Sequence, residues 1–160
     1  MNTRFLLYGA NGFVGQEIAA QALRLGLQPV AAGRDAPKIG ALAARLGIEP
    51  RVFGLDDARA VDRALEDVPV VLHCAGPFIY TSKPLVDGCL RTGTHYLDIT
   101  GEIPVYAAVQ QRDEEARARG VMLLPGVGFD IVPSDCLAVH LKRRLPAAKK
   151  LTLAFSNNGP

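Results

Sequence analysis

Short runs rich in apolar and β-branched residues alternate with longer segments of helical periodicity from one end of the chain to the other. Near the N-terminus, Arg4–Tyr8 predicts a strand, and Val14–Leu25, whose apolar positions form one stripe, predicts a helix that Gly26 ends. The pattern predicts further strands at Gln28–Ala32, Arg51–Phe53, Val70–His73, His95–Ile99 and Val121–Leu124. It predicts further helices at Lys38–Leu46, at Ala58–Leu65, from about Ser82 to Thr92, from a first turn with Pro104 to a stop at Gly120, and at Pro133–Leu145.

This alternation is typical of βαβ units, which assemble into a parallel sheet with helices on both faces. The predicted fold class is α/β, a doubly wound parallel Rossmann sheet with the strand order 3-2-1-4-5-6. One segment lies outside this scheme, because Lys150–Phe155 resembles a seventh strand shortly before the last residue, Pro160. We expect this segment to begin a further structural unit.

Composition and charge narrow the class of protein. With 160 residues, 49% of them hydrophobic and 21% charged, the chain has the make-up of one ordinary globular domain. A net charge of +2 from scattered basic residues excludes a general nucleic-acid binder. Purely apolar runs of about four residues are too short for a membrane span or a secretion signal, so we expect a cytoplasmic protein. Cys74, Cys89 and Cys136 are too widely spaced for a zinc motif and are expected to be buried thiols, with no metal bound.

A glycine-rich segment falls between the first predicted strand and the first predicted helix. It consists of Gly9, Ala10, Asn11, Gly12, Phe13, Val14 and Gly15, with the spacing G-x-x-G-x-x-G. At this place in a Rossmann fold, glycines permit a tight turn, and the unpaired N–H groups of the helix start bind a pyrophosphate. A hairpin turn at Asn11-Gly12 is the alternative, which the following helical periodicity opposes. The segment predicts a dinucleotide-binding site.

Charged residues after the second predicted strand bear on which dinucleotide binds. An NAD-binding domain usually has an acidic residue here for the ribose 2′-hydroxyl, whereas Arg34 suits the 2′-phosphate of NADP. Lys38 is a second candidate cation. Asp35 weakens this interpretation, because an inward carboxylate would repel the phosphate, and a plain surface role for Arg34 is the alternative. The predicted cofactor is NADP, with NAD as a further candidate.

Two later segments extend the predicted cofactor site. Leu55 and Asp56 follow the third predicted strand, where the adenine edge is commonly received, with capping of the next helix by Asp56 as an equal alternative. After the fourth predicted strand, the small residues of Cys74-Ala75-Gly76-Pro77 allow the backbone to approach the second ribose and the nicotinamide. A plain tight turn is the alternative for this second segment.

No complete catalytic pair is evident. The Tyr-x-x-x-Lys pair of short-chain dehydrogenases has one near match, Tyr80 with Lys83, which is one residue too short and is predicted to lie in a loop. Three carboxylates follow predicted strands at the edge where ligands bind, yet a capping or turn role accounts for each: Asp98, Glu102 and Asp130.

Two remaining features have ordinary structural explanations. The glycine-rich loop Gly126–Asp130 leads into the last predicted helix and is a candidate second anion site, with N-capping by Ser134 as the alternative. His73, His95 and His140 are expected to be core or surface residues without a catalytic role.

Five segments together resemble the saccharopine dehydrogenase-like NAD(P)-binding domain, a family that includes trans-acting enoyl reductases. They are Gly9–Gly15, Ala32–Arg34, His73–Pro77, Tyr96–Glu102 and Pro125–Asp130. The two most distinctive are Ala-Gly-Pro after the fourth predicted strand and Tyr-Leu-Asp-x-Thr-Gly-Glu after the fifth. The resemblance implies a two-domain oxidoreductase, in which this domain binds the nicotinamide cofactor and a following domain supplies substrate and dimer contacts.

From these observations we expect residues 1–146 to form an NAD(P)-binding Rossmann domain and residues 147–160 to be the truncated start of a missing substrate and dimerisation domain. The expected function is NADP(H) binding for hydride transfer to a C=C or C=N bond of a small-molecule substrate, in a homodimer. A non-catalytic NADP-binding sensor is the alternative. A nucleotide-sugar epimerase or reductase of the extended short-chain type is less favoured, because it requires the missing Tyr-x-x-x-Lys pair.

Overall fold

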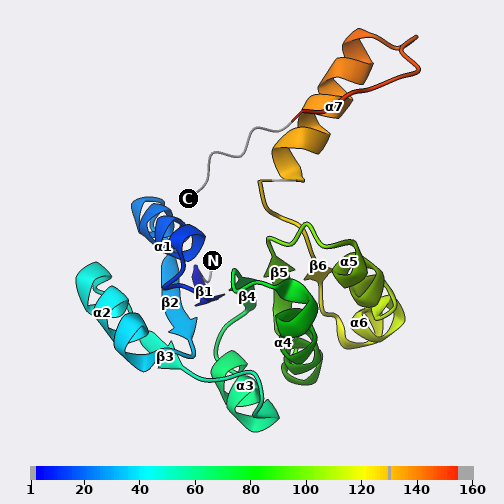
Figure 1. Cartoon of the computed structure of the whole chain (residues 1–160). Coiled ribbons are helices and arrows are strands. Elements are labelled where there is room, and N and C mark those ends of the chain that lie inside the picture. The colour runs from blue at the N-terminus through cyan, green and yellow to red at the C-terminus, as the bar shows by residue number, and fades with distance from the viewer. Residues whose placement is uncertain (1–2, 130, 155–160) are drawn as a thin grey trace.

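The computed structural model describes residues 3–129 and 131–154, and within these ranges six parallel strands form one sheet (Figure 1). The strands are β1 (Arg4–Tyr8), β2 (Gln28–Gly33), β3 (Pro50–Val52), β4 (Val70–His73), β5 (His95–Asp98) and β6 (Leu123–Leu124). Their order is β3-β2-β1-β4-β5-β6, which confirms the predicted doubly wound α/β fold. The neighbours of β1 change from β2 to β4 at the middle of the sheet, and ligands of such sheets bind outside the carboxyl ends of the strands at this point.

Helices cover both faces of the sheet (Figure 1). They are α1 (Phe13–Arg24), α2 (Ala36–Leu46), α3 (Ala58–Leu65), α4 (Phe78–Thr92), α5 (Ile103–Gln110), α6 (Asp113–Arg119) and α7 (Val132–Arg144). Successive side chains of a strand point to opposite faces, so Leu7 of β1 belongs to a buried cluster with residues of α1 and α2, whereas Leu6 belongs to a second cluster with residues of α3, α4 and α5. Both leucines are fully buried, and burial of one such side chain stabilises the fold by about 1.5–3 kcal/mol.

The start of α4 differs from the prediction. This helix begins at Phe78, four residues before the predicted start at Ser82. The carboxylate of Glu102 accepts the backbone N–H groups of Phe78 and Ile79, each at 2.8 Å, and so provides the acceptors that the first turn needs. Tyr80 and Lys83 therefore lie on a helix, and the prediction of a loop there is wrong.

The single helix predicted from Pro104 to Gly120 is two helices. It is interrupted at Gln111 and Arg112, and α6 then begins with three acidic residues in its first turn, where the helix dipole favours negative charge. The guanidinium of Arg112 binds Asp87 of α4 and Glu115 of α6, which ties the corner to both helices. Smaller differences occur at strand ends, because β3 begins and ends one residue earlier than predicted and β6 begins two residues later.

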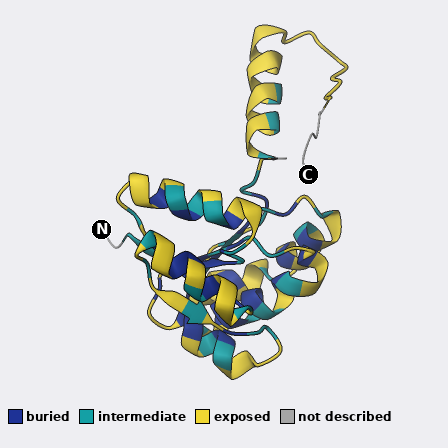
Figure 2. Ribbon diagram, turned by 60° about the vertical axis from the view of Figure 1, so that its left-hand side comes forward, coloured by how far each residue is buried: buried dark blue, intermediate teal, exposed yellow. Residues whose placement is uncertain are grey.

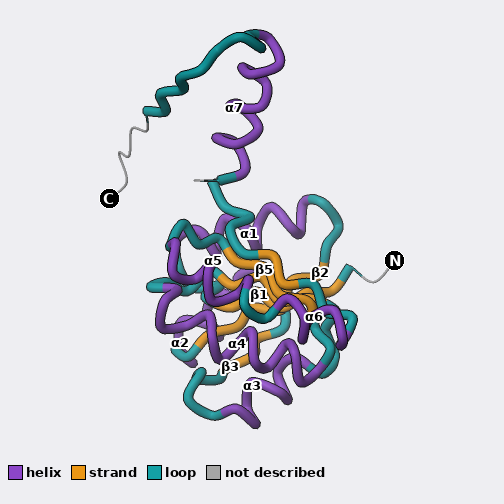
Figure 3. The backbone as a smooth tube through the Cα atoms, turned by 90° about the vertical axis from the view of Figure 1, so that its right-hand side faces the viewer, coloured by secondary structure: helices purple, strands orange, loops and turns teal. Residues whose placement is uncertain are grey.

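The C-terminal segment does not join the sheet. None of the described residues of α7 is buried, and Figures 2 and 3 show this helix extending away from the sheet and its covering helices. Cys136 on α7 is exposed, so the prediction of a buried thiol is wrong there, whereas Cys89 is buried and Cys74 half-buried. Residues 150–154 form no strand in the described part of the chain, which contradicts the predicted seventh strand, and Phe155 lies outside the described residues. An isolated extended segment has no neighbour to accept its hydrogen bonds.

Among the residues that the structure describes, no helix combines the length and the apolar character needed to cross a bilayer.

The contact between α3 and α4 leaves no room for a side chain at Gly88. A Cβ placed there lies 2.6 Å from Cγ1 of Val61 and 3.0 Å from Cδ1 of Leu65. We expect Gly88→Leu to lower the free energy of unfolding by about 1–3 kcal/mol, as overpacking of a core does. Gly40→Ala on α2 is the control, because a Cβ at Gly40 meets nothing within 4 Å and loss of a helical glycine stabilises by about 0.5–1 kcal/mol. Urea unfolding measures both, and an unchanged midpoint for Gly88→Leu would contradict this packing.

Candidate functional site

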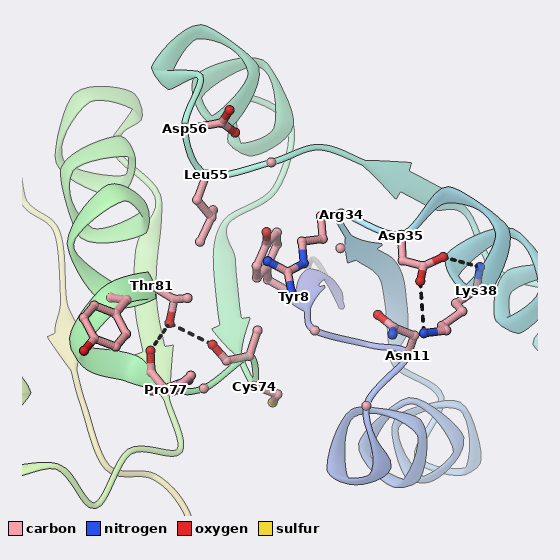
Figure 4. Close-up of a pocket in the computed structure, with 17 residues that line it drawn as sticks. Tyr8, Asn11, Arg34, Asp35, Lys38, Leu55, Asp56, Cys74, Pro77 and Thr81 are labelled. Carbon is pink, nitrogen blue, oxygen red and sulfur yellow. Dashed lines mark hydrogen bonds and ion pairs between the residues drawn. The ribbon is translucent and has the colours of Figure 1, made fainter.

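A cavity of about 860 Å³ opens at the carboxyl edge of the sheet, where β1 has β2 on one side and β4 on the other (Figure 4). Its lining comes from the segments that follow β1, β2, β3 and β4. The volume lies in the range of small-molecule and cofactor pockets. The pocket therefore stands where the topology of a doubly wound sheet places a ligand.

The turn after β1 approaches the loop after β4 very closely. Gly9 has φ +85°, and a Cβ on it would lie 2.8 Å from the backbone nitrogen of Ala75. A Cβ on Gly15 would lie 2.3 Å from the carbonyl oxygen of Gly9. Only glycine fits both positions without displacing backbone, whereas a Cβ on Gly12 would lie 3.3 Å from that same oxygen. Of the glycine-rich segment, Gly9, Asn11 and Gly12 line the pocket.

The other members of that segment have supporting places. Ala10 and Gly15 are buried beneath the turn, and Phe13 and Val14 form the exposed start of α1. The N-terminus of α1 has no side-chain cap and no acidic residue in its first turn. In contrast, α2, α3 and α4 receive carboxylates from Asp35, Asp57 and Glu102 respectively. The positive end of α1 is therefore the one beside the pocket that is suited to an external anion.

Three charged residues follow β2 at the pocket rim. The carboxylate of Asp35 caps α2 by accepting the backbone N–H of Lys38 at 3.1 Å, and the Lys38 ammonium lies 3.1 Å from its second oxygen. The backbone hydrogen bond, followed by the Lys38 side chain, lowers the pKa of Asp35. This cap also starts α2 at Ala36, two residues before the predicted start at Lys38. Arg34 forms no ion pair with any described residue and lines the pocket.

Tyr8, the last residue of β1, is a pocket residue that the sequence prediction missed. Its hydroxyl donates to the carbonyl oxygen of Phe53 at 3.4 Å, and the residue is 4% exposed. Burial raises the pKa of Tyr8, an effect that the nearby Arg34 opposes. Figure 4 shows the Arg34 side chain beside Tyr8 at the centre of the pocket. The sequence pattern predicted Tyr8 only as the last residue of a strand, although a position at the carboxyl end of a strand is itself a signal for a pocket residue.

The segment after β3 contributes Leu55 and Asp56 to the lining. Asp57 caps α3 by accepting the N–H of Arg59 at 2.9 Å, so the alternative of a cap at Asp56 is wrong. Leu55 points into the pocket in Figure 4. The neighbouring Gly54 also lines the pocket, and a Cβ on it would lie within 2.4 Å of the Asp56 carboxylate.

All four predicted residues after β4, Cys74, Ala75, Gly76 and Pro77, line the pocket, and the Gly76–Pro77 peptide bond is cis. The hydroxyl of Thr81 donates to the carbonyl oxygen of Ala75 at 2.7 Å. Burial raises the pKa of Cys74 to about 12, so its thiol stays protonated at neutral pH and is a poor nucleophile. Tyr80 and Thr81 also line the pocket, and the prediction missed them because it placed the start of α4 too late.

The remaining candidates lie outside the pocket lining. Asp98 is fully buried and accepts the N–H groups of Thr100 and Gly126, at 3.0 and 2.8 Å. The N–H of Val127 donates to the carbonyl oxygen of Asp98, so two N–H groups of the glycine-rich loop are already bonded. This overturns the loop as a second anion site built on those groups. Asp130 lies outside the described residues.

Ser134 and the histidines have structural roles in the described chain. The residue that precedes α7 is Ile131, and the hydroxyl of Ser134 donates to its carbonyl oxygen at 3.1 Å, so the predicted N-cap at Ser134 is wrong. His95 accepts the N–H of Met122 at 3.0 Å, and His140 is exposed on α7. His73 is buried in the core, as predicted.

Comparison with known families agrees with this geometry. Residues 5–124 match the family model of the saccharopine dehydrogenase NADP binding domain. The chain belongs to this family. This saccharopine dehydrogenase-like domain therefore has NADP as its cofactor, and its larger relatives are oxidoreductases.

Two relatives and one solved structure illustrate the relationship. The domain is 34% identical over 149 residues to a trans-acting enoyl reductase of Mycobacterium leprae, covering 88% of this chain and 35% of that protein. It is 26% identical over 161 residues to a saccharopine dehydrogenase-like oxidoreductase of Bos taurus, covering 88% and 37%. Apo saccharopine dehydrogenase (L-Glu forming) from Saccharomyces cerevisiae superposes with a TM-score of 0.77 at 23% identity, covering 91% and 32%. The chain thus spans about a third of the length of these proteins.

Loss of the Glu102 carboxylate is expected to destabilise the pocket wall. Glu102→Ala removes the acceptor of two N–H groups at the positive end of α4, which should lower the free energy of unfolding by about 1–2 kcal/mol. Glu102→Gln keeps one acceptor oxygen and should lower the free energy of unfolding by less. Glu17→Ala, on the exposed face of α1, is the control and should be nearly neutral. Equal urea midpoints for Glu102→Ala and Glu17→Ala would contradict the capping role.

Proposed function

We propose that the pocket binds NADP(H) with its pyrophosphate at the start of α1. The observation that carries this proposal is the uncapped N-terminus of α1 behind the close turn Gly9–Gly15, between helices whose own N-termini are capped by carboxylates. Two negative phosphates are attracted to unpaired N–H groups and to the positive end of a helix dipole. The glycines bring that backbone close enough for contact.

The two halves of the cofactor are assigned to opposite ends of the pocket. Leu55 and Asp56 are proposed to receive the adenine, with the apolar side chain of Leu55 against the ring. The small residues Cys74–Pro77 are proposed to face the second ribose and the nicotinamide. The protonated thiol of Cys74 adds no charge there.

Arg34 is proposed to bind the 2′-phosphate that distinguishes NADP from NAD. Its guanidinium lines the pocket without a carboxylate partner among the described residues, and it suits a phosphate geometrically. Asp35 does not oppose this contact, since its carboxylate is engaged by the N–H and the ammonium of Lys38. Lys38 also lines the pocket and adds positive charge at the rim.

For the whole protein we propose hydride transfer between NADP(H) and a C=C or C=N bond of a small molecule, in a homodimer. The enoyl reductase and saccharopine dehydrogenase relatives support this choice of bonds. The bound nicotinamide supplies or accepts the hydride, and the residues of this chain hold and orient it. We propose that residues 1–146 are the cofactor-binding unit, and that residues 147–160, beyond α7, begin the substrate and dimerisation domain.

The pyrophosphate site is tested by Gly12→Val. Gly12 is exposed, so we expect the variant to fold, while its branched side chain stands where the backbone must approach the phosphates. Calorimetry should detect no NADPH binding to this variant and normal binding to Gly40→Ala, whose substitution lies away from the pocket. Unchanged NADPH affinity in folded Gly12→Val would show that the pyrophosphate does not bind at this turn.

The 2′-phosphate contact is tested by Arg34→Ala. The wild type should prefer NADPH over NADH, and the variant should lose about 1.5–3 kcal/mol of binding free energy for NADPH with little change for NADH, as for a charge-assisted contact. Arg24→Ala is the matched control, because this exposed arginine lies in the last turn of α1, outside the pocket lining, and its loss should leave both affinities unchanged. Equal losses for both cofactors in Arg34→Ala would assign Arg34 a different role.

A further inference from the structure

Three buried side chains form a continuous hydrogen-bond chain beneath the pocket. His73 of β4 bonds through Nδ1 to the hydroxyl of Tyr96 at 3.0 Å, and this hydroxyl bonds to Oδ2 of Asp98 at 2.8 Å. All three residues are 0% exposed. Burying a polar side chain costs free energy unless the side chain is hydrogen-bonded, so the members of this hydrogen-bond chain are expected to satisfy one another.

One end of the chain reaches the proposed cofactor loop. Nε2 of His73 lies 3.1 Å from the carbonyl oxygen of Ala75, which also accepts the Thr81 hydroxyl. Ala75 lines the pocket, and its backbone nitrogen is the atom that a Cβ on Gly9 would approach to 2.8 Å. The position of Ala75 therefore affects the β4 loop and the glycine turn together.

The other end of the chain is anchored on β5 and the loop after β6. Oδ1 of Asp98 accepts the N–H of Thr100 and that of Gly126. These two bonds fill the acceptor positions of Oδ1 and leave Oδ2 for Tyr96. The carboxyl group is thus held by backbone from two segments.

The three hydrogen bonds from Ala75 to Asp98 limit where the hydrogens of the group can lie. The Ala75 carbonyl can only accept, so Nε2 of His73 carries a hydrogen. The two remaining bonds, His73 to Tyr96 and Tyr96 to Asp98, need two hydrogens, and the Tyr96 hydroxyl has one. The second hydrogen is shared between Nδ1 of His73 and Oδ2 of Asp98, as a property of the coupled group.

Burial affects two members of this group, His73 and Tyr96. It lowers the pKa of His73 to about 4, so the imidazole by itself does not keep a second proton at neutral pH. Burial is also the main cause that raises the pKa of Tyr96, so the phenol stays protonated and can be a donor. Aromatic rings enclose His73, with the Phe78 and Tyr8 centroids at 4.9 and 5.8 Å.

We propose that His73, Tyr96 and Asp98 are positioning residues of the cofactor site, a hydrogen-bond chain with one shared proton that holds the Ala75 carbonyl and thereby fixes the position of the nicotinamide-side loop. The inference rests on the proposed NADP(H) function. It assigns to Asp98 the role of a hydrogen-bonding anchor that acts through Tyr96 and His73, without contact to the cofactor.

The experiment compares two ligands in four variants. NADPH spans the whole pocket, whereas adenosine 2′-monophosphate occupies only the adenine side and reports on folding of that side. Tyr96→Phe and Asp98→Ala break the chain, and each should raise the NADPH Kd about five- to tenfold, the range for loss of a hydrogen bond or two. Binding of adenosine 2′-monophosphate, followed by NMR titration, should not change.

Asp98→Asn is the conservative variant that tests the shared proton. Its amide oxygen can accept from Thr100 and Gly126, and its N–H can donate to Tyr96, which then donates to His73. We expect this variant to retain the wild-type NADPH Kd within about twofold. Tyr106→Phe is the matched control, since its hydroxyl donates to the Thr100 carbonyl at 2.8 Å beside the same loop and does not reach Ala75.

Each outcome has one meaning. Failure of the wild type to bind either ligand would overturn the proposed function itself. Wild-type binding of both ligands with an unchanged NADPH Kd in Tyr96→Phe would overturn the positioning role alone. If Asp98→Asn binds NADPH as weakly as Asp98→Ala does, the shared proton is overturned. An equal loss of NADPH affinity in Tyr106→Phe would show that general destabilisation causes the effect, and would overturn the positioning role. If Tyr96→Phe does not fold, the comparison of Asp98→Asn with Asp98→Ala still decides, because only the amide can restore the hydrogen bonds at this position.

Discussion

The close approach of the β1–α1 turn to the β4–α4 loop is the contact on which the pocket depends. The N–H of Cys74 donates to the carbonyl oxygen of Tyr8 at 2.8 Å, and Gly9 then turns back with its α-carbon against Ala75. A side chain at Gly9 would separate the two loops, and the cavity between β2 and β4 would lose one wall. As a result, the N-terminus of α1 points toward the opening of the pocket.

The electrostatic character of the pocket depends on which helix N-termini have a carboxylate of the same chain beside them. Carboxylates of Asp35, Asp57 and Glu102 neutralise three N-termini around the pocket, and α1 has none. Of these four helices, α1 is therefore the one whose positive end has no carboxylate beside it. The Asp35 carboxylate also pairs with the Lys38 ammonium, which offsets the charge of Asp35 at the pocket rim.

The wall of the pocket beside Cys74–Pro77 is held by hydrogen bonds to the loop after β4 and to the first turn of α4. Thr81 and His73 both donate to the Ala75 carbonyl, and Glu102 holds the first turn of α4 from outside the helix. Each of these contacts joins residues from separate strands or loops. For the proposed position of the nicotinamide, these bonds fix the backbone beside the ring, and precise positioning of reacting groups contributes to the rate of a reaction.

The alternation of short apolar strands and helical segments was enough to predict the sheet and its order, since right-handed βαβ connections leave few alternatives. The sequence was enough to name several pocket residues, because each lies in a short segment after a predicted strand and topology puts such segments at one edge: Gly9, Gly12, Arg34, Leu55 and Cys74–Pro77. Their contacts to NADP(H) remain predictions.

Other features depend on residues that are distant along the chain. The start of α4 depends on Glu102, more than twenty positions later, so Tyr80 and Thr81 appeared to be loop residues. The choice of Asp57 over Asp56 as a cap is a matter of side-chain direction that two adjacent aspartates do not reveal. Lys150–Phe155 alternates apolar and polar residues as a strand does, yet residues 150–154 form no strand. Periodicity shows which face of a segment is apolar, whereas a strand also needs a neighbour that pairs with it and buries that face.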